Sequence, residues 1–390
     1  MPINNRIAGF HDDLTAWRRD LHAHPELGFE EHRTAGIVAE KLQEFGIEVH
    51  RGLATTGVVG TLRGNQPGDR VIALRADMDA LPMPEANDFE HASQNPGKMH
   101  ACGHDGHTTM LLGAARYLAE TRNFAGTVHF VFQPAEEGGG GGRVMVEQGL
   151  FEQFPAEEVY ALHNVPGIPV GHFAGRAGPM MAATDEYDIV IKGRGGHAAQ
   201  PHKTVDPLVI GAQIVTALQT ITSRNADPVE SLVVSITEFH AGSAYNVIAQ
   251  EAVLRGTIRS FDPAQRKLAE EQLKRIATGI AASLGGSAEV KFMPGYPATR
   301  NHSAQLDKAL GVAEGLVGPE RVHGNIAPVM GGEDFAYMLE AKPGAYLFIG
   351  AGSAQGGRNL HQTHYDFNDE ILPLGASYFA QLVETLLARE

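Results

Sequence analysis

Two short segments bring together side chains that can bind metal ions and move protons. The first is residues 100–107, with the sequence HACGHDGH. Cys102 and His104 stand two residues apart, so a thiolate and an imidazole can face one metal ion, and adjacent glycines allow the tight backbone that this needs. The alternative for this segment is a buried free cysteine beside surface histidines.

The second segment is residues 133–142, with the sequence QPAEEGGGGG. Glu136 and Glu137 cannot both bind one ion in the same way from an extended backbone, but one can bind while the other faces a metal-bound water as general base. The alternative is a solvated turn with two acids. The glycine run lacks the Gly-Lys-Ser/Thr ending of a phosphate loop, so we expect tight backbone and no nucleotide cradle.

Five further residues are candidates because of their type and their place in the chain. His163 follows an apolar run and His361 lies in a polar loop, where ordinary histidines and metal ligands both occur. His197 stands in a glycine-rich turn that would equally suit a plain strand-to-helix loop. Arg259, together with Asn246, is a candidate for binding a carboxylate, since guanidinium groups pair with carboxylates bidentately. A lone arginine on a strand is otherwise a solvated charge.

The elements that must position these residues follow from the apolar pattern. Short apolar runs at 71–74, 127–132 and 159–162 predict buried strands, and 108–120 predicts a helix. Strands that alternate with helices favour an α/β fold with a largely parallel mixed sheet. In such sheets the chemistry gathers beyond the carboxyl ends of strands. Four candidates fall at such ends: Asp77, Glu136, Glu137 and His163.

The pattern changes near residue 184 and returns to strand–helix alternation after about 294. The segment between predicts a βαββαβ order, which is the ferredoxin-like arrangement. Its expected strands lie at 187–191, 232–237, 252–258 and 288–292, and its helices at 207–223 and 263–283. We therefore expect a catalytic domain of residues 1–183 and 295–390, split by an inserted domain of residues 184–294.

Composition narrows the class of protein. Thirty-one basic residues against 46 acidic ones give a net charge of −15 over 390 residues, which disfavours nucleic acid and anionic lipid as partners. No apolar run reaches the roughly 18 residues of a membrane helix. The N-terminal residues lack a basic region followed by an apolar stretch, so we expect no secretory signal. The single cysteine excludes an internal disulfide and suits the cytoplasm.

Taken together, the segments resemble the M20 metallopeptidase family, and in particular its aminoacylase/hippurate hydrolase branch. The resemblance covers most of the chain, with the motifs in the same order. It rests on RRDLH at 18–22, PELGFEE at 25–31, RADMDALP at 75–82, MHACGHD at 99–105, QPAEE at 133–137 and GGHAA at 195–199.

The resemblance implies a catalytic centre of two divalent metal ions and a water activated by Glu136. The implied metal ligands are Cys102, His104, Glu137, His163 and His361. It implies that His197 stabilises the oxyanion, while Asn246 and Arg259 bind the free carboxylate of an N-acyl amino acid. It also implies that the inserted domain is a lid through which two chains form a homodimer.

The chain departs from the wider family at one position. That family has His-x-Asp where this chain has residues 75–77, RAD, and it uses an aspartate as bridging ligand. Here Cys102 is expected to bridge the two ions, and Asp77 to orient a metal-bound group. A mixed set of thiolate, imidazole and carboxylate ligands suits zinc, and manganese, cobalt or nickel remain open.

Two other functions stay open from the sequence. A metallo-dipeptidase or carboxypeptidase would use the same residues on short peptides. A non-catalytic metal-binding or small-molecule-binding protein is disfavoured, because Glu136 has no evident structural task.

Overall fold

The computed structural model describes residues 4–356 and 358–389, and the chain divides into two compact units. Unit 1 comprises residues 1–180, 299–327 and 334–390, and unit 2 comprises residues 181–298 and 328–333. The short segment 328–333 was not expected in unit 2. It belongs there because the Ala182 N–H donates to the carbonyls of Val329 (3.1 Å) and Gly331 (2.9 Å). The roles predicted for the two domains stay predictions.

Unit 1 is built on an eight-stranded mixed sheet in the order β1-β2-β4-β3-β5-β16-β6-β15. Its centre is parallel, since β3 pairs in parallel with β4 and β5, and β5 with β16. This confirms the predicted largely parallel α/β sheet. The strands are β1 Glu48–Leu53, β2 Gly57–Arg63, β3 Gln66–Asp77, β4 Ala125–Gln133, β5 Glu158–Pro166, β6 Phe173–Ala174, β15 Val322–His323 and β16 Gly344–Gly352. A separate pair consists of β7 Gly178–Met181 and β14 Thr299–Asn301.

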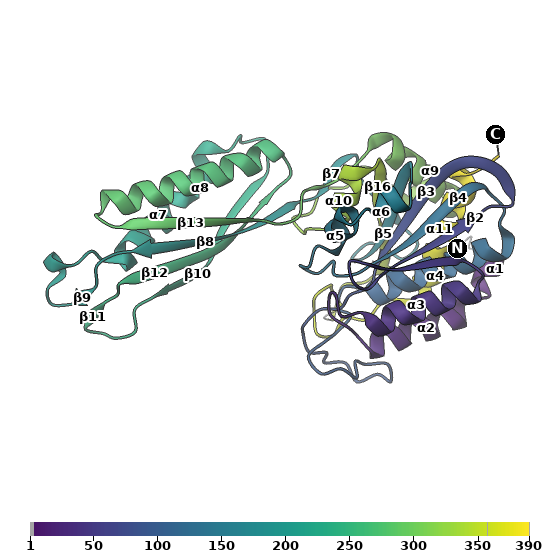
Figure 1. Cartoon of the computed structure of the whole chain (residues 1–390), viewed down its shortest axis with the longest axis horizontal. Coiled ribbons are helices and arrows are strands. Elements are labelled where there is room, and N and C mark those ends of the chain that lie inside the picture. Colours follow the sequence, from purple (N-terminus) through teal and green to yellow (C-terminus); the bar gives the residue numbers. More distant parts are fainter. Residues whose placement is uncertain (1–3, 357, 390) are drawn as a thin grey trace. The chain divides into compact units, whose positions relative to one another are not determined.

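Helices cover both faces of this sheet because its central strands are apolar on both sides. Along β3, Ile72, Leu74 and Ala76 join the larger apolar core, whereas Ala73 is buried outside that core. The larger core packs under α1 Asn5–Ala8, α2 His11–Ala23, α3 His32–Glu44, α4 His104–Thr121, α9 Ser303–Val317 and α11 Leu372–Leu386. The short helices α5 Gly141–Glu147, α6 Leu150–Gln153 and α10 Phe335–Ala341 lie away from α2, α3 and α4 (Figure 1). Two 3-10 turns complete unit 1, η3 Pro319–Arg321 and η4 Asp369–Ile371.

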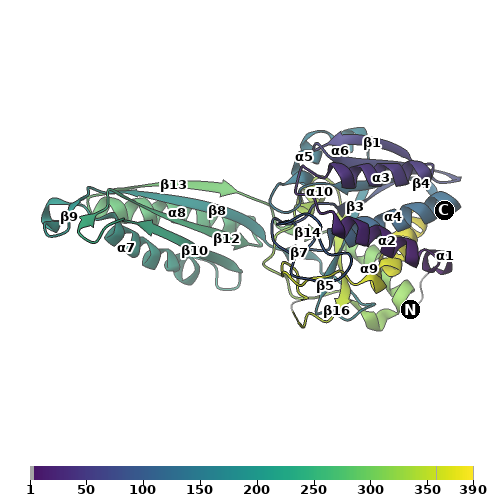
Figure 2. The same cartoon turned by 90° about the horizontal axis from the view of Figure 1, so that it is seen from below.

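Unit 2 confirms the predicted ferredoxin-like order. Four antiparallel strands follow the order β10-β12-β8-β13, and two long helices pack on the sheet (Figure 2). Both helices begin at an Asp-Pro pair, where Asp206 and Asp262 accept N–H groups of the first turn. The elements are β8 Ala183–Lys192, α7 Pro207–Thr220, β10 Leu232–Ala241, β12 Glu251–Ser260, α8 Pro263–Ser283 and β13 Ser287–Pro294.

Smaller elements complete unit 2. The strands β9 Gly196–His197 and β11 Val247–Ile248 form a two-stranded ribbon. A 3-10 turn η1 Pro201–Lys203 precedes α7, and the π-helical turn η2 Ile221–Asn225 extends it. Across the described residues of both units, no helix is long and apolar enough to cross a membrane.

Candidate metal centre and active site

The five predicted ligands lie together in unit 1, at the carboxyl edge of its sheet. Their ligand atoms form two overlapping groups in which all atoms lie within 4.8 Å of one another. One group is Cys102, His104 and His163, and the other is Cys102, Glu137 and His361. Cys102 belongs to both groups, which is the arrangement that a thiolate shared by two ions needs.

Different elements deliver these side chains to one place. His104 is the first residue of α4, and His163 lies near the end of β5. Gly103 has φ +93°, and a Cβ there would lie 2.4 Å from the Asn164 side-chain oxygen. Only glycine therefore fits between Cys102 and His104, which explains the tight backbone expected from the sequence.

Hydrogen bonds at Nδ1 hold the buried imidazoles of His104 and His163 in the tautomer whose Nε2 can bind a cation. His104 Nδ1 lies 3.2 Å from Asp79 Oδ1, and His163 Nδ1 donates to the Asn164 carbonyl at 2.7 Å. Both rings then present Nε2 toward the cluster, where His163 Nε2 lies 3.4 Å from Cys102 Sγ. Such second contacts are typical of metal-binding histidines.

Two buried atoms point to the place of a cation. Among the described residues, the buried His104 Nε2 has no hydrogen-bond partner. The buried Glu137 Oε1 lies 4.0 Å from it and 3.2 Å from His361 Nε2, another predicted ligand. Buried polar atoms left without partners are costly unless a ligand satisfies them. A metal cation would satisfy these atoms, and sulfur, imidazole and carboxylate groups are suitable donors for one.

The charges of the cluster also favour bound cations. Burial lowers the pKa of His104, but the carboxylates of Asp77, Asp79 and Glu137 outweigh it and raise this pKa to about 10. Burial, together with Glu137, Glu136 and Asp77, raises the pKa of the Cys102 thiol well above its usual value. A thiolate therefore forms here only when positive charge balances the acids.

Asp77 lies directly behind the cluster. Its Oδ1 accepts a hydrogen bond from His107 Nδ1 at 2.6 Å, and its Oδ2 pairs with Arg75 Nη1 at 2.7 Å. His104 Nε2 is 3.8 Å from Asp77 Oδ2, and these two residues form a third candidate group with His107. The predicted orienting role of Asp77 stays a prediction, and these contacts are compatible with it.

Glu136 lies beside the ligands on the turn that follows β4. Its Oε1 accepts the Asp334 N–H at 3.3 Å, and its side chain is largely buried. The Asp334 carboxylate is held in turn by Gln133 Nε2 at 2.7 Å, by the Gly142 N–H at 2.7 Å and by Arg75 Nη2 at 3.1 Å. A buried network thus fixes the group that hydrogen-bonds the predicted base.

Sequence reasoning missed three of these contacting residues: His107, Asp79 and Asp334. His107 lies three residues after His104, so both face the same side of α4, and that spacing was a usable signal. Asp79 lay inside a quoted motif but carried no assigned task. Asp334 lies outside the family motifs. Its contact with Glu136 joins segments almost two hundred residues apart, so no local pattern indicates it.

The remaining predicted residues lie in unit 2, and the structure does not gather them at one point. His197 and Asn246 are neighbours, since the Ala198 N–H donates to the Asn246 carbonyl at 3.0 Å. Arg259 lies near the far end of β12, opposite Thr184 and Val233. At about 3.4 Å per step, the eight steps along β12 from Glu251 to Arg259 span about 27 Å. One chain's Asn246 and Arg259 therefore cannot bind the same small carboxylate.

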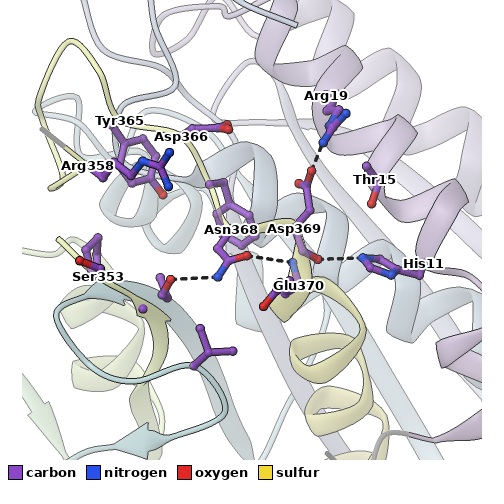
Figure 3. A pocket seen from close by; sticks show the side chains of 15 residues that line it. His11, Thr15, Arg19, Ser353, Arg358, Tyr365, Asp366, Asn368, Asp369 and Glu370 are labelled. Atoms are coloured by element: carbon purple, nitrogen blue, oxygen red, sulfur yellow. Dashed lines mark hydrogen bonds and ion pairs between the residues drawn. The ribbon is translucent and has the colours of Figure 1, made fainter. Parts of the chain in front are cut away.

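A cavity in unit 1 lies apart from the cluster. It has a volume of about 610 Å³ and lies between α2 and the segment that leads into η4 (Figure 3). Asp369 lines it and pairs with Arg19 Nε at 2.9 Å. None of the predicted ligands is among the described residues that line it.

The N-terminal motif RRDLH forms a buried charged network next to α4. Arg18 is fully buried and lies 2.6 Å from Asp369, 2.8 Å from Asp366 and 3.8 Å from Asp105. Burial lowers the pKa of His22, but hydrogen bonds to Asp105 and Glu85 raise it to about 9. Arg18 and His22 thus hold Asp105, the residue after His104.

Comparisons with known proteins agree with this geometry. A family model described as peptidase family M20/M25/M40 matches residues 73–385. The chain is 44% identical to hippurate hydrolase of Campylobacter jejuni over 94% of each chain, and 40% identical to thermostable carboxypeptidase 2 of Saccharolobus solfataricus over 97% of each. A crystal structure of the Bacillus subtilis YXEP protein, described as a dinuclear metal binding peptidase, matches 97% of this chain and 99% of its own, with a TM-score of 0.83 and 37% identity.

Proposed function

The chain belongs to peptidase family M20/M25/M40, and from that premise we propose that it is a dinuclear-metal amidohydrolase that releases amino acids from their N-acyl forms. The observation that carries the proposal is Cys102, which is shared by two groups of ligand atoms beside Glu136. Hippurate is an acylated glycine with a free carboxylate, so the relative's name points to this substrate class.

The five clustered side chains would hold the two ions. Cys102 would bridge them, with His104 and His163 on one side and Glu137 and His361 on the other. Zinc suits this mixture of sulfur, nitrogen and oxygen, and manganese, cobalt and nickel are the alternatives that metal analysis would separate. A ligand thiol that must stay reduced also supports our proposal of a cytoplasmic location.

The proposed reaction assigns one task to each of the chain's residues. When bound, two metal ions would lower the pKa of a substrate water and polarise the amide carbonyl. Glu136 takes the proton from that water and then delivers it to the leaving nitrogen. The Asp334 N–H holds the Glu136 carboxylate in one direction during both transfers.

His197 is the proposed donor to the oxyanion. The Ala199 N–H donates to His197 Nδ1 at 3.0 Å, so Nδ1 accepts and the ring proton stays on Nε2. His197 is exposed, which leaves this N–H available to a substrate. A neutral imidazole would then stabilise developing negative charge as a hydrogen-bond donor.

We propose that substrate binding needs two copies of the chain. Asn246 and His197 lie at one end of unit 2 and Arg259 at the other, so a pair of chains would let Arg259 meet its partner's Asn246 and His197. In the described part of the chain β10 is an edge strand of its sheet. Exposed apolar residues lie on it and on α7: Leu208, Val209, Val233 and Phe239. Symmetric pairing is a common way to cover such an edge.

The decisive experiment combines metal analysis with a substrate panel. Purified protein would be assayed on N-benzoyl and N-acetyl amino acids and on dipeptides, and its metal content measured in the same preparation. We expect two ions per chain and the highest kcat/KM on acylated amino acids. A preference for dipeptides would favour the carboxypeptidase alternative, which the second relative supports. Metal retained without turnover on any compound would indicate a binding protein.

A further inference from the structure

The N-terminal motif PELGFEE at 25–31 has no task in the proposed chemistry, yet it lies against the turn that carries Glu136. Glu31 Oε1 accepts the Ala135 N–H at 2.8 Å. A Cβ on Gly28 would lie 2.9 Å from the Ala135 Cβ, so the two backbones are in close contact. Two residues of one motif thus converge on the residue directly before the predicted base.

Ala135 has an unusual backbone conformation for its residue type. Its φ is +53°, in the left-handed region that favours glycine. The residue is fully buried, and its carbonyl accepts the Gly141 N–H at 3.0 Å. A conformation of this kind persists only where the surroundings fix it. Here Glu31 fixes the N–H side and Gly141 fixes the carbonyl side.

The conformation of Ala135 decides where the next side chain points. Glu136 meets the Asp334 N–H at 3.3 Å, and Glu137 is tied by its own N–H to Asp79 Oδ2 at 2.9 Å. If Ala135 relaxed toward negative φ, the Glu136 carboxylate would turn away from the Asp334 N–H. The general base has to stay within hydrogen-bond reach of the proton that it takes.

We propose that Glu31 is a positioning residue for Glu136. It acts by holding Ala135 in the left-handed conformation, where Ala135 packs against Gly28, which has no side chain. The inference rests on the proposed function only in taking Glu136 as the base of amide hydrolysis. The contacts that carry it belong to unit 1 alone.

Glu31 is well placed for this task. It is fully buried, and its second oxygen accepts the Thr56 hydroxyl proton at 2.6 Å. Burial is the main reason that its pKa is raised to about 7. A glutamine has the same shape and still offers an oxygen to the Ala135 N–H, while the Thr56 hydroxyl can turn to accept from its amide. An alanine offers nothing to either group.

The test compares five variants with the wild type on metal-replete enzyme. Glu31→Ala and Gly28→Ala should each lower kcat about 10- to 100-fold, with KM within about twofold and metal content unchanged. Glu31→Gln should keep kcat within severalfold of wild type. Glu30→Ala is the matched control, since Glu30 is its exposed neighbour, paired with Lys98 at 3.3 Å. Gly36→Ala is the control for Gly28, because a Cβ there meets nothing within 4 Å.

A crystal structure of Glu31→Ala gives a second readout that needs no turnover. We expect Ala135 to leave positive φ and the Glu136 carboxylate to lose the Asp334 N–H. Wild-type kcat in Glu31→Ala and Gly28→Ala, or an unchanged turn in the crystal, would overturn the inference. If the wild type hydrolysed no acylated amino acid, the proposed function would fail, and the crystal structure would still decide the fate of the turn.

Discussion

The Glu136 carboxylate accepts the Asp334 peptide N–H at 3.3 Å and lies beside the ligand cluster, where the proposed reaction needs a base for the substrate water. Glu136→Gln keeps the shape of the side chain and removes the base. We expect kcat to fall by about 10²- to 10⁴-fold, the usual range for a lost general base, while metal content stays at the wild-type level. Steady-state kinetics and metal analysis on one preparation check this. Substantial turnover in that preparation would assign proton transfer to another residue.

The Cys102 thiolate is the most testable of the proposed ligands. Serine is a poor anion at neutral pH, so Cys102→Ser should lower metal occupancy, and activity should fall in proportion. Because Cys102 belongs to both groups of ligand atoms, we expect the loss of more than one ion per chain. Metal content measured after dialysis gives the answer, and full occupancy with a normal rate would remove Cys102 from the ligand set.

The buried Glu31 carboxyl makes stability depend on pH. Its pKa is about 7 in the folded chain against 4.5 for the free side chain, mainly because of burial and with a contribution from Asp79. The folded state therefore holds this proton more tightly, and its stability falls as pH rises from about 4.5 to about 7, by at most about 3 kcal/mol. Glutamine stays neutral, so the Tm of Glu31→Gln relative to wild type should increase between about pH 5 and pH 8. A constant difference in Tm would contradict the raised pKa.

At the residue scale, the family resemblance carried by short motifs implied the ligands Cys102, His104, Glu137, His163 and His361. The structure brings their ligand atoms close together, while their binding of metal stays a prediction. The left-handed Ala135 could not be predicted, since a backbone angle of a non-glycine residue has no local signature. The approach of Asp334 to Glu136 depends on how two remote loops pack, which local patterns do not encode.

At the scale of elements, the first turn of α4 carries His104, one of the five predicted ligands. His104 and His107 lie there, and Gly106 between them packs against Phe367, where a Cβ would lie 2.1 Å from a ring carbon. The helix cannot take a methyl group at this point without moving. Its position, rather than the side chain alone, therefore sets where the His104 imidazole lies.

Gly106→Ala should displace the first turn of α4. Overpacking of this kind costs about 1–3 kcal/mol, and we expect weaker metal binding as well, because His104 moves with the helix. Chemical unfolding and metal titration measure the two effects. Gly279→Ala is the control, since Gly279 lies in α8 with nothing within 4 Å of its Cβ position, and alanine favours helix. If both variants had the same stability and metal affinity, the packing of α4 would not determine the position of His104.

The elements themselves were more predictable than their ends. The βαββαβ order of unit 2 follows from strict alternation and two Asp-Pro helix starts, which are local signals. By contrast, residues 328–333 join unit 2 through backbone hydrogen bonds to Ala182, and no apolar pattern marks such a contact. The strand β3 also begins at Gln66, well before the apolar run at 71–74 that revealed it.

At the scale of the whole molecule, the length of β12 argues for an assembly. Arg259 and the ribbon that carries His197 lie at opposite ends of unit 2, and β12 alone spans about 27 Å from Glu251 to Arg259. A substrate of the proposed size bridges only a fraction of that length. If all three of His197, Asn246 and Arg259 serve one substrate, some of them must come from another chain.

Mixing two inactive variants tests this arrangement directly. We expect His197→Ala to lower turnover strongly with metal content intact, because His197 lies in unit 2 and the ligand cluster in unit 1. Glu136→Gln is inactive for the opposite reason, since it keeps His197 and lacks the base. In a mixed dimer with exchanged histidines, one of the two sites has a wild-type base and a wild-type His197. Random exchange makes half of the dimers mixed, so activity should recover to about a quarter of wild type. Native mass spectrometry would confirm the exchange, and a verified mixture that stays inactive would return His197 to the site of its own chain or remove it from the chemistry.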